Sequence, residues 1–281
     1  GFAAGLAGCI VLMVVEFGAW ALVRPGGGHP EGAAPPWEEI RLRTPDGVAL
    51  AGAWARAPNP TGRTVLLLHG FAEDRTALWD RAEDLLARGW NVALLDSRGR
   101  GRSGNAWCTF GTWESGDIPV WLDALSRRVG TGFVAAAWGR SMGAAIALRA
   151  AAEDCRVHAL VLEAPYARLH PCVARWLGSR SVPPWLVDGV LWRAGRITGC
   201  ALDDPPPATV ARAVRVPVLI VHGSEDRIAP PSEVERLGSA LPGRPRVIPV
   251  PGAGHANVYE MGGVELARSI EAFLADSAAS T

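Results

Sequence analysis

The sequence predicts an α/β fold: a mostly parallel central sheet of about eight strands, flanked by helices and carrying a small helical cap. Three observations support this fold class. Short apolar runs alternate with amphipathic segments along most of the chain. The runs are apolar throughout, as expected for strands buried on both faces of a parallel sheet. The chain has 281 residues, 49% of them hydrophobic, which is enough for one large domain.

The N-terminal segment stands apart from this alternation. Residues 2–23 carry one charge, on Glu16, and as a helix they would rise about 33 Å, against a bilayer core of about 30 Å. We expect residues 1–23 to be a transmembrane or signal-anchor helix, so that the protein is single-pass and membrane-anchored with an extracytoplasmic domain. Glu16 favours the alternative of an apolar helix buried against the domain, because ionisable groups are costly in lipid. Residues 24–36, rich in Gly and Pro, are predicted to be a linker.

The following domain is predicted to span residues 37–281. It begins with two strands around a turn at residues 45–47. A buried strand at 64–70 and a helix with an apolar face at 78–86 come next. Further strands are expected at 91–96, 133–139, 158–165, 217–223 and 246–252, and further helices near 117–129, 141–152, 232–241 and 262–274.

One interval interrupts the pattern. About 50 residues separate the strand ending near Leu162 from the strand starting near Pro217, although a simple crossover needs far fewer. We predict that residues 169–200 form a helical cap over the edge of the sheet where such folds bind ligands. Three tryptophans of this segment are candidate substrate-binding residues, with packing inside the cap as the alternative: Trp176, Trp185 and Trp192.

Charge and cysteine content exclude several classes of function. Lys+Arg and Asp+Glu number 28 each, so no net positive charge favours nucleic acid as a partner. The five cysteines include no C-x-x-C pair and no histidine at zinc-ligand spacing, so no metal and no other cofactor is expected. Cys172 and Cys200 would be able to pair in an exported domain, but unpaired buried thiols are the expected state.

A serine lies at the predicted strand-to-helix turn after residue 139. In the segment GRSMG, Ser141 is flanked by Gly139 and Gly143. A tight turn imposes an unusual backbone conformation on the serine and brings neighbouring chain so close that side chains two residues away are excluded. The hydroxyl is then expected at the carboxyl edge of the sheet and at a helix N-terminus, where an anion is favoured. This context predicts a nucleophile.

A nucleophilic serine needs a base, and the base needs an orienting carboxylate. His255 follows the last predicted strand, which returns it to the same sheet edge, and is the best candidate base among the six histidines. Asp226 follows the penultimate strand and is the predicted acid, with Glu163, at the end of an earlier strand, as the alternative. The order Ser141, Asp226, His255 is the one expected for this architecture.

Stabilising an oxyanion requires two backbone N–H donors. One is predicted to come from Met142, directly after the nucleophile. The other is predicted to come from Phe71, in the loop after the strand that ends at Leu68. His69, in the same loop, is expected to brace it rather than act as a base.

These motifs resemble those of the α/β-hydrolase superfamily. The resemblance covers about residues 37–274 and rests on HGFAEDR, LLDSRGRGRSG, GRSMGAAIAL, HGSEDRIAPP and GAGHAN, in that order. The sequence is most similar to serine aminopeptidase-type and bacterial membrane-anchored hydrolases with a short cap. The resemblance implies a catalytic triad and two oxyanion donors at matching positions, namely Ser141, Asp226, His255, Phe71 and Met142.

The predicted function is that of a serine hydrolase that cleaves a carboxylic ester through an acyl-enzyme. A peptidase, thioesterase or acyltransferase would use the same triad, and a non-catalytic, membrane-tethered binding module is an alternative of a different class. The expected partner is a small-molecule or lipid-like acyl substrate. The motifs do not specify acyl length or oligomeric state.

Overall fold

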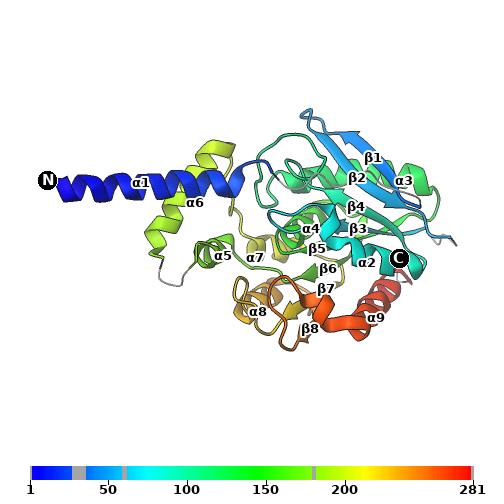
Figure 1. Cartoon of the computed structure of the whole chain (residues 1–281). Coiled ribbons are helices and arrows are strands. Elements are labelled where there is room, and N and C mark those ends of the chain that lie inside the picture. Colours follow the sequence, from blue (N-terminus) through cyan, green and yellow to red (C-terminus); the bar gives the residue numbers. More distant parts are fainter. Residues whose placement is uncertain (1, 27–35, 59–61, 179–181, 280–281) are drawn as a thin grey trace.

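The computed structural model describes residues 2–26, 36–58, 62–178 and 182–279, with side chains from residue 8 onward. In this part of the chain, eight strands form one sheet in the order β1-β2-β4-β3-β5-β6-β7-β8 (Figure 1). The strands are β1 (Glu38–Arg43), β2 (Ala49–Ala55), β3 (Arg63–Leu68), β4 (Asn91–Asp96), β5 (Val134–Arg140), β6 (Val157–Glu163), β7 (Val218–Gly223) and β8 (Arg246–Val250). Strand β2 is antiparallel to both of its neighbours, and the other pairs are parallel. The predicted fold class is therefore confirmed.

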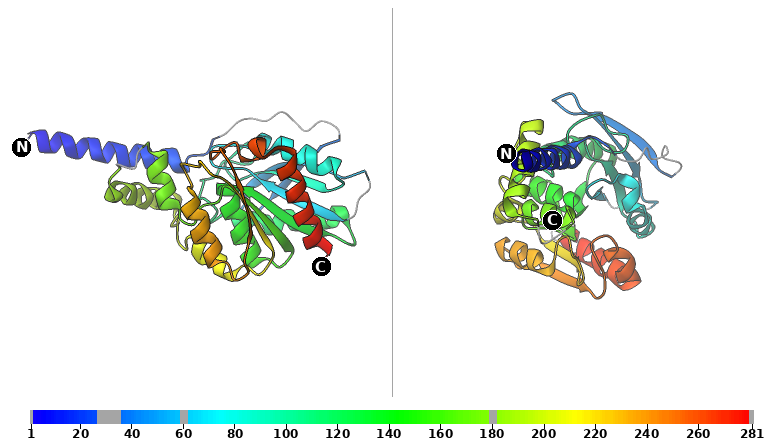
Figure 2. Two further views of the ribbon diagram at one scale, coloured as in Figure 1. Left: turned by 90° about the horizontal axis from the view of Figure 1, so that it is seen from below. Right: turned by 60° about the vertical axis from the view of Figure 1, so that its left-hand side comes forward.

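Helices cover both faces of the sheet (Figures 1 and 2). One face carries α3 (Ile118–Val129), α4 (Met142–Glu153) and α8 (Pro231–Ala240), and the other carries α2 (Trp79–Ala87) and α9 (Val258–Ala279). In β3, Leu66 and Leu68 belong to the core with α3 and α4, whereas Val65 and Leu67 belong to the core with α2 and α9. Because successive strand residues point to opposite faces, burial on both sides explains why residues 65–68 are all apolar.

Short helical elements complete the domain. The four-residue α7 (Pro207–Val210) precedes β7, and three 3₁₀ helices lie at Arg75–Leu78, Glu114–Asp117 and Ala211–Ala213. The last helix differs from its predicted start at residue 262. It begins at Val258 and contains one non-helical residue, Gly263, with φ of +55°, where two helical segments meet. Glycine adopts this conformation readily, so the chain kinks there between the two helical segments.

The predicted cap region contains two helices outside the sheet. They are α5 (Leu169–Trp176) and α6 (Pro184–Thr198), and residues 179–181 between them lie outside the described residues. The backbone N–H groups of Leu169 and His170 donate to the Asp203 carboxylate at 2.9 and 3.3 Å, which fixes the start of α5. Helix α6 ends at Thr198 and is followed by Gly199 in the left-handed conformation, a common way to end a helix.

The N-terminal helix α1 (Phe2–Val23) corrects one prediction. Among the helices of the described chain, none is long and apolar enough to cross a membrane. The prediction of a single-pass, membrane-anchored protein with an extracytoplasmic domain is therefore wrong. The apolar residues at the end of α1 instead pack within the protein, because Ala19, Leu22 and Val23 belong to the main core. The Cys108 N–H also donates to the Val23 carbonyl at 2.9 Å.

Helix α1 packs on α6 along its last turns, while its N-terminal part projects beyond the body of the molecule (Figures 1 and 2). A Cβ on Gly18 would lie 3.2 Å from a methyl group of Val190 in α6, so the two helices approach closely at this glycine. Glu16, the one charge in the segment, pairs with Arg193 of α6 at 2.6 and 2.9 Å. Of the predicted linker at 24–36, residues 27–35 lie outside the described residues.

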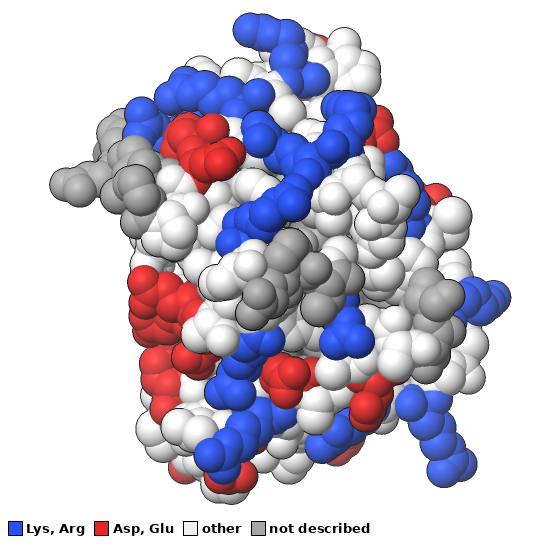
Figure 3. All heavy atoms as spheres, turned by 90° about the vertical axis from the view of Figure 1, so that its right-hand side faces the viewer, with Lys and Arg blue, Asp and Glu red and all other residues white. Residues whose placement is uncertain are grey.

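Charged side chains are interspersed over the face turned away from the projecting end of α1. Figure 3 shows arginines beside carboxylates, with neither sign covering the whole face. This mixture agrees with the equal numbers of basic and acidic residues.

Candidate active site

Ser141 lies at a sharp turn between β5 and α4. Its φ of +53° and ψ of −111° are rarely adopted by residues with a side chain. A Cβ on Gly139 would collide with the Gly143 carbonyl, and a Cβ on Gly143 would collide with the Leu68 carbonyl. Both glycines are therefore steric requirements of the turn. The Ser141 N–H donates to the Glu163 carbonyl of neighbouring β6 at 2.8 Å, which holds the strained residue in place.

The Ser141 hydroxyl begins a chain of polar contacts. Its Oγ lies 2.9 Å from Nε2 of His255, and Nδ1 of the same ring lies 2.7 Å from Oδ2 of Asp226. The other Asp226 oxygen accepts the N–H groups of Ile228 and Ala229 at 2.9 and 2.8 Å. The Asp226 side chain is fully buried, whereas that of His255 is 22% exposed. The structure thus brings together the three side chains that the sequence singles out.

Glu163, the alternative acid, is engaged elsewhere. Its carboxylate accepts from Nε and Nη2 of Arg81 at 3.0 and 2.6 Å and from Nε1 of Trp138 at 3.0 Å. Burial disfavours the charge of Arg81, but Glu163 and Glu260 more than offset this and raise the pKa of the guanidinium. Glu163 therefore belongs to a buried ion pair and does not orient His255.

The loop after β3 is braced by His69. Its Nδ1 lies 2.8 Å from the Gly70 carbonyl, and its Nε2 lies 3.1 Å from the Ser97 backbone nitrogen. The carbonyl requires a donor and the Ser97 N–H requires an acceptor, so the ring is neutral with its proton on Nδ1. Burial, the main cause, lowers the pKa of His69, which favours the same neutral form.

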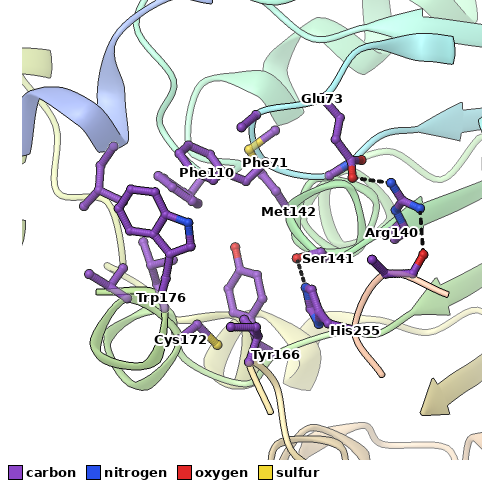
Figure 4. Close-up of a pocket in the computed structure, with 17 residues that line it drawn as sticks. Phe71, Glu73, Phe110, Arg140, Ser141, Met142, Tyr166, Cys172, Trp176 and His255 are labelled. Carbon is purple, nitrogen blue, oxygen red and sulfur yellow. Dashed lines mark hydrogen bonds and ion pairs between the residues drawn. The ribbon is translucent and has the colours of Figure 1, made fainter. Parts of the chain in front are cut away.

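A cavity of about 180 Å³ opens onto Ser141 (Figure 4). The two predicted oxyanion donors, Phe71 and Met142, both line it. Met142 is the first residue of α4, where backbone N–H groups have no intrahelical acceptor. One side of the cavity is formed mainly by apolar side chains, including Leu22, Phe110, Tyr166, Leu169, Cys172, Val173 and Trp176. Two charged residues, Glu73 and Arg140, lie on the other side.

Only one of the three candidate tryptophans lines this cavity. The Trp176 ring is edge-on to Phe71 with 5.6 Å between centroids, and Phe71 stacks on Phe110 at 4.9 Å. Trp185 and Trp192 lie outside the cavity and are 58% and 67% exposed.

Sequence reasoning did not assign a site role to several residues of the cavity, among them Glu73, Arg140, Phe110 and Leu22. Glu73 and Arg140 lie inside the HGFAEDR and GRSMG motifs, which is a signal that could have identified both. Phe110 and Leu22 carried no such signal. Leu22 lies in a segment that the predicted linker separated from the domain, and only its packing places it in the cavity wall.

The cysteines of the cap are free thiols. Cys172 is in the cavity wall, where burial raises the pKa of the thiol well above its usual range, and Cys200 is partly buried. Within the described residues, no group of His, Cys, Asp and Glu side chains is placed to hold a metal ion.

Comparison with known proteins agrees with this architecture. A family model described as "Serine aminopeptidase, S33" matches residues 59–198. The AB hydrolase superfamily protein YisY of Bacillus subtilis is 27% identical over 240 residues, covering 71% of this chain and 87% of YisY. The uncharacterized protein YqkD of Bacillus subtilis is 26% identical over 225 residues, covering 78% of this chain and 73% of YqkD.

Among solved structures, the esterase Pf2001 of Pyrococcus furiosus superimposes with a TM-score of 0.75. It is 22% identical, and the superposition covers 90% of this chain and 99% of the esterase. The family match, the relatives and the order of the strands lead to one conclusion: the chain belongs to the α/β-hydrolase superfamily.

Proposed function

We propose that the protein is a serine hydrolase that cleaves carboxylic esters through an acyl-enzyme, with Ser141 as nucleophile. Superfamily membership supports a hydrolase. The observation that carries the finer proposal is the continuous contact from Ser141 through His255 to the buried Asp226, at the opening of a largely apolar cavity.

The proposed reaction has two halves. Ser141 Oγ attacks the ester carbonyl carbon while His255 Nε2 accepts the hydroxyl proton, and the N–H groups of Phe71 and Met142 bind the oxyanion. Collapse of the tetrahedral intermediate breaks the bond to the alcohol oxygen, which receives the proton from His255. Water then attacks the acyl-enzyme in the same way, releasing the carboxylic acid and restoring Ser141. Asp226 keeps the imidazole in the required tautomer throughout.

The cavity supports an ester with an apolar acyl group. Burying apolar carbon against the side that contains Phe110 and Trp176 is favourable, and few polar groups compete for it. An aminopeptidase would instead need a carboxylate for the substrate ammonium group. Glu73 is the one carboxylate in the described cavity lining, and Arg140 already neutralises it. The same triad also suits a thioesterase or an acyltransferase.

Replacing the nucleophile tests the proposal. Ser141→Ala removes one oxygen at a cavity-facing turn, so the fold should persist while turnover falls by about 10⁴- to 10⁶-fold, as for other serine hydrolases. A fluorophosphonate probe should label the parent and not the variant. The measurements are probe labelling and hydrolysis of p-nitrophenyl acyl esters alongside aminoacyl anilides.

The matched control is Ser126→Ala, at a half-buried position of α3 outside the cavity, which should keep both labelling and turnover. Labelling of Ser141→Ala at the parent's rate would refute the nucleophile. Faster cleavage of anilides than of esters would move the proposal to a peptidase.

A further inference from the structure

Two charged side chains flank the proposed reaction centre without a role in its chemistry. Arg140 directly precedes Ser141 at the end of β5, and Glu73 lies in the loop that carries Phe71 (Figure 4). We infer that the Glu73–Arg140 ion pair is a positioning device that holds the Phe71 loop against the nucleophile turn and the loop of His255. The inference rests on the proposed function, because a donor loop needs exact placement only if an oxyanion forms.

The Glu73 carboxylate connects the loop to the nucleophile turn. Its Oε2 accepts the Gly70 N–H at 2.8 Å, one peptide before the predicted Phe71 donor. Its Oε1 pairs with Nη2 of Arg140. A Cβ on Gly70 would lie 2.9 Å from Oε2, so glycine at this position allows the carboxylate to approach the backbone.

Arg140 extends the connection to the histidine loop. Its Nη1 donates to the carbonyl of Ala256 at 3.5 Å, directly after His255. One guanidinium therefore contacts the three segments that carry the oxyanion donor, the nucleophile and the base. Arginine suits this task because its planar fork directs several N–H groups at once.

The Phe71 loop needs such support. Ala72 has φ of +60°, which is unfavourable for a residue with a Cβ and persists only where the surroundings enforce it. The Asp74 side chain caps the following 3₁₀ helix through the Thr76 N–H at 2.9 Å, which secures the far end of the loop. Glu73 secures the end nearest Ser141.

Charge and burial favour positioning over an ionic subsite. The Arg140 side chain is 8% exposed and that of Glu73 is 30% exposed. Burial opposes ionisation of Glu73, but the hydrogen bond and charge of Arg140 outweigh it and lower the pKa of the carboxyl. Both groups are therefore charged at neutral pH and compensate each other, so neither offers a free charge to a substrate.

Loosening the Phe71 loop should have a specific effect on the kinetic constants. An oxyanion donor acts in the transition state, so loosening its loop should lower kcat and kcat/KM by the same factor and leave KM almost unchanged. A wall that merely contacts bound substrate would raise KM instead. Comparing the change in kcat with the change in KM therefore separates a positioning role from simple contact with the substrate.

The test uses Glu73→Gln, Arg140→Met and the double variant. Glutamine keeps the size of Glu73 and an acceptor for Gly70 but loses the ion pair. Each single change should lower kcat on a p-nitrophenyl ester by about 10- to 100-fold, below the loss from removing a donor outright. The kcat of the double variant should be no lower than that of the less active single variant, because both changes break the same Glu73–Arg140 contact.

The affinity for a transition-state analogue is a second measurement, and a purely structural role of the ion pair would not change it selectively. A trifluoromethyl ketone accepts Ser141 Oγ at its carbonyl carbon and forms a tetrahedral oxyanion. Its affinity should fall by the same factor as kcat, while the affinity for an unreactive ether of the same shape should not change. Asp46→Asn is the control, because it removes a carboxylate from buried Arg98 at 2.8 Å, outside the cavity, and should leave kcat at the parent value.

Two results would overturn the inference: a rise in KM with kcat unchanged, or equal losses of affinity for the ketone and the ether. If Arg140→Met does not fold, Glu73→Gln, at the more exposed partner, decides by the same criteria. Absence of fluorophosphonate labelling in the parent would instead contradict the proposed function, so the two failures are distinguishable.

Discussion

The two sides of the cavity are built in different ways. The side around Ser141 consists of residues at strand ends, held by directed hydrogen bonds such as those from His255 to Asp226. The opposite side consists largely of side chains from α1, α5 and nearby loops, held by apolar packing around Leu22 and by the ring contact of Trp176 with Phe71. Hydrogen bonds specify distance and angle, whereas apolar burial depends mainly on area and shape. Changes on the first side should therefore alter rate, and changes on the second should alter selectivity.

After the nucleophile itself, the largest effect should come from the acid on the strand-end side. Asp226→Asn removes the carboxylate that fixes the imidazole and should lower kcat by about 10⁴-fold. Glu163→Gln breaks the buried pair with Arg81 and should cost stability, about 3–5 kcal/mol, while kcat per folded molecule stays close to the parent value.

Measuring kcat and the free energy of unfolding for both variants separates the two carboxylates. The opposite pattern, with Glu163→Gln inactive and Asp226→Asn active, would assign the acid to the end of β6. If both variants fold but both are inactive, the distinction between a carboxylate needed for catalysis and a structural carboxylate would not hold.

A smaller, graded effect is expected on the helical side. Trp176→Ala enlarges the apolar part of the cavity and should shift the preference among acyl esters toward longer chains. One methylene contact in a pocket changes kcat/KM by about 10- to 200-fold, so the shift should stay within that range. The rate on acetyl esters should change least, because a short chain does not reach the far wall.

The matched control is Trp192→Ala, at an exposed tryptophan outside the cavity, which should leave the chain-length profile unaltered. Leu22→Ala should shift the profile in the same direction as Trp176→Ala, because Leu22 also lines the cavity although it lies in α1. An unchanged profile in both cavity variants would mean that the helical side does not bind the acyl group.

The smallest effect tests how α1 is held. Gly18→Leu would press against Val190 of α6 and should lower the free energy of unfolding by about 1–3 kcal/mol through overpacking. Gly8→Leu, in the same helix, has open space around the new side chain. Both changes gain similar helix propensity, so the difference between their unfolding curves isolates the contact with α6. Equal stability of the two variants would mean that α1 is not fixed by α6.

Much of the strand-end side could be predicted because its signals are local. The apolar runs gave the strands, and the segment GRSMG gave the turn at Ser141. Parallel strands then place the loops of Asp226 and His255 at one edge without any knowledge of side-chain packing. The Glu73–Arg140 contact was not predictable in this way, because no spacing rule relates a loop residue to a guanidinium from another strand.

By itself, the sequence determined the fold class, the succession of strands and helices along the chain, and which polar residues follow the strands. These features depend on periodicity and on glycines whose clearance is needed within a few residues, as at Gly139 and Gly143. Only the tertiary structure decided what the apolar surface of the N-terminal helix packs against. An apolar helix looks alike in sequence whether lipid or protein covers it, since burial depends on two surfaces and the sequence of one does not identify the other. The structure packs Leu22 into the core and the cavity wall and pairs Glu16 with Arg193.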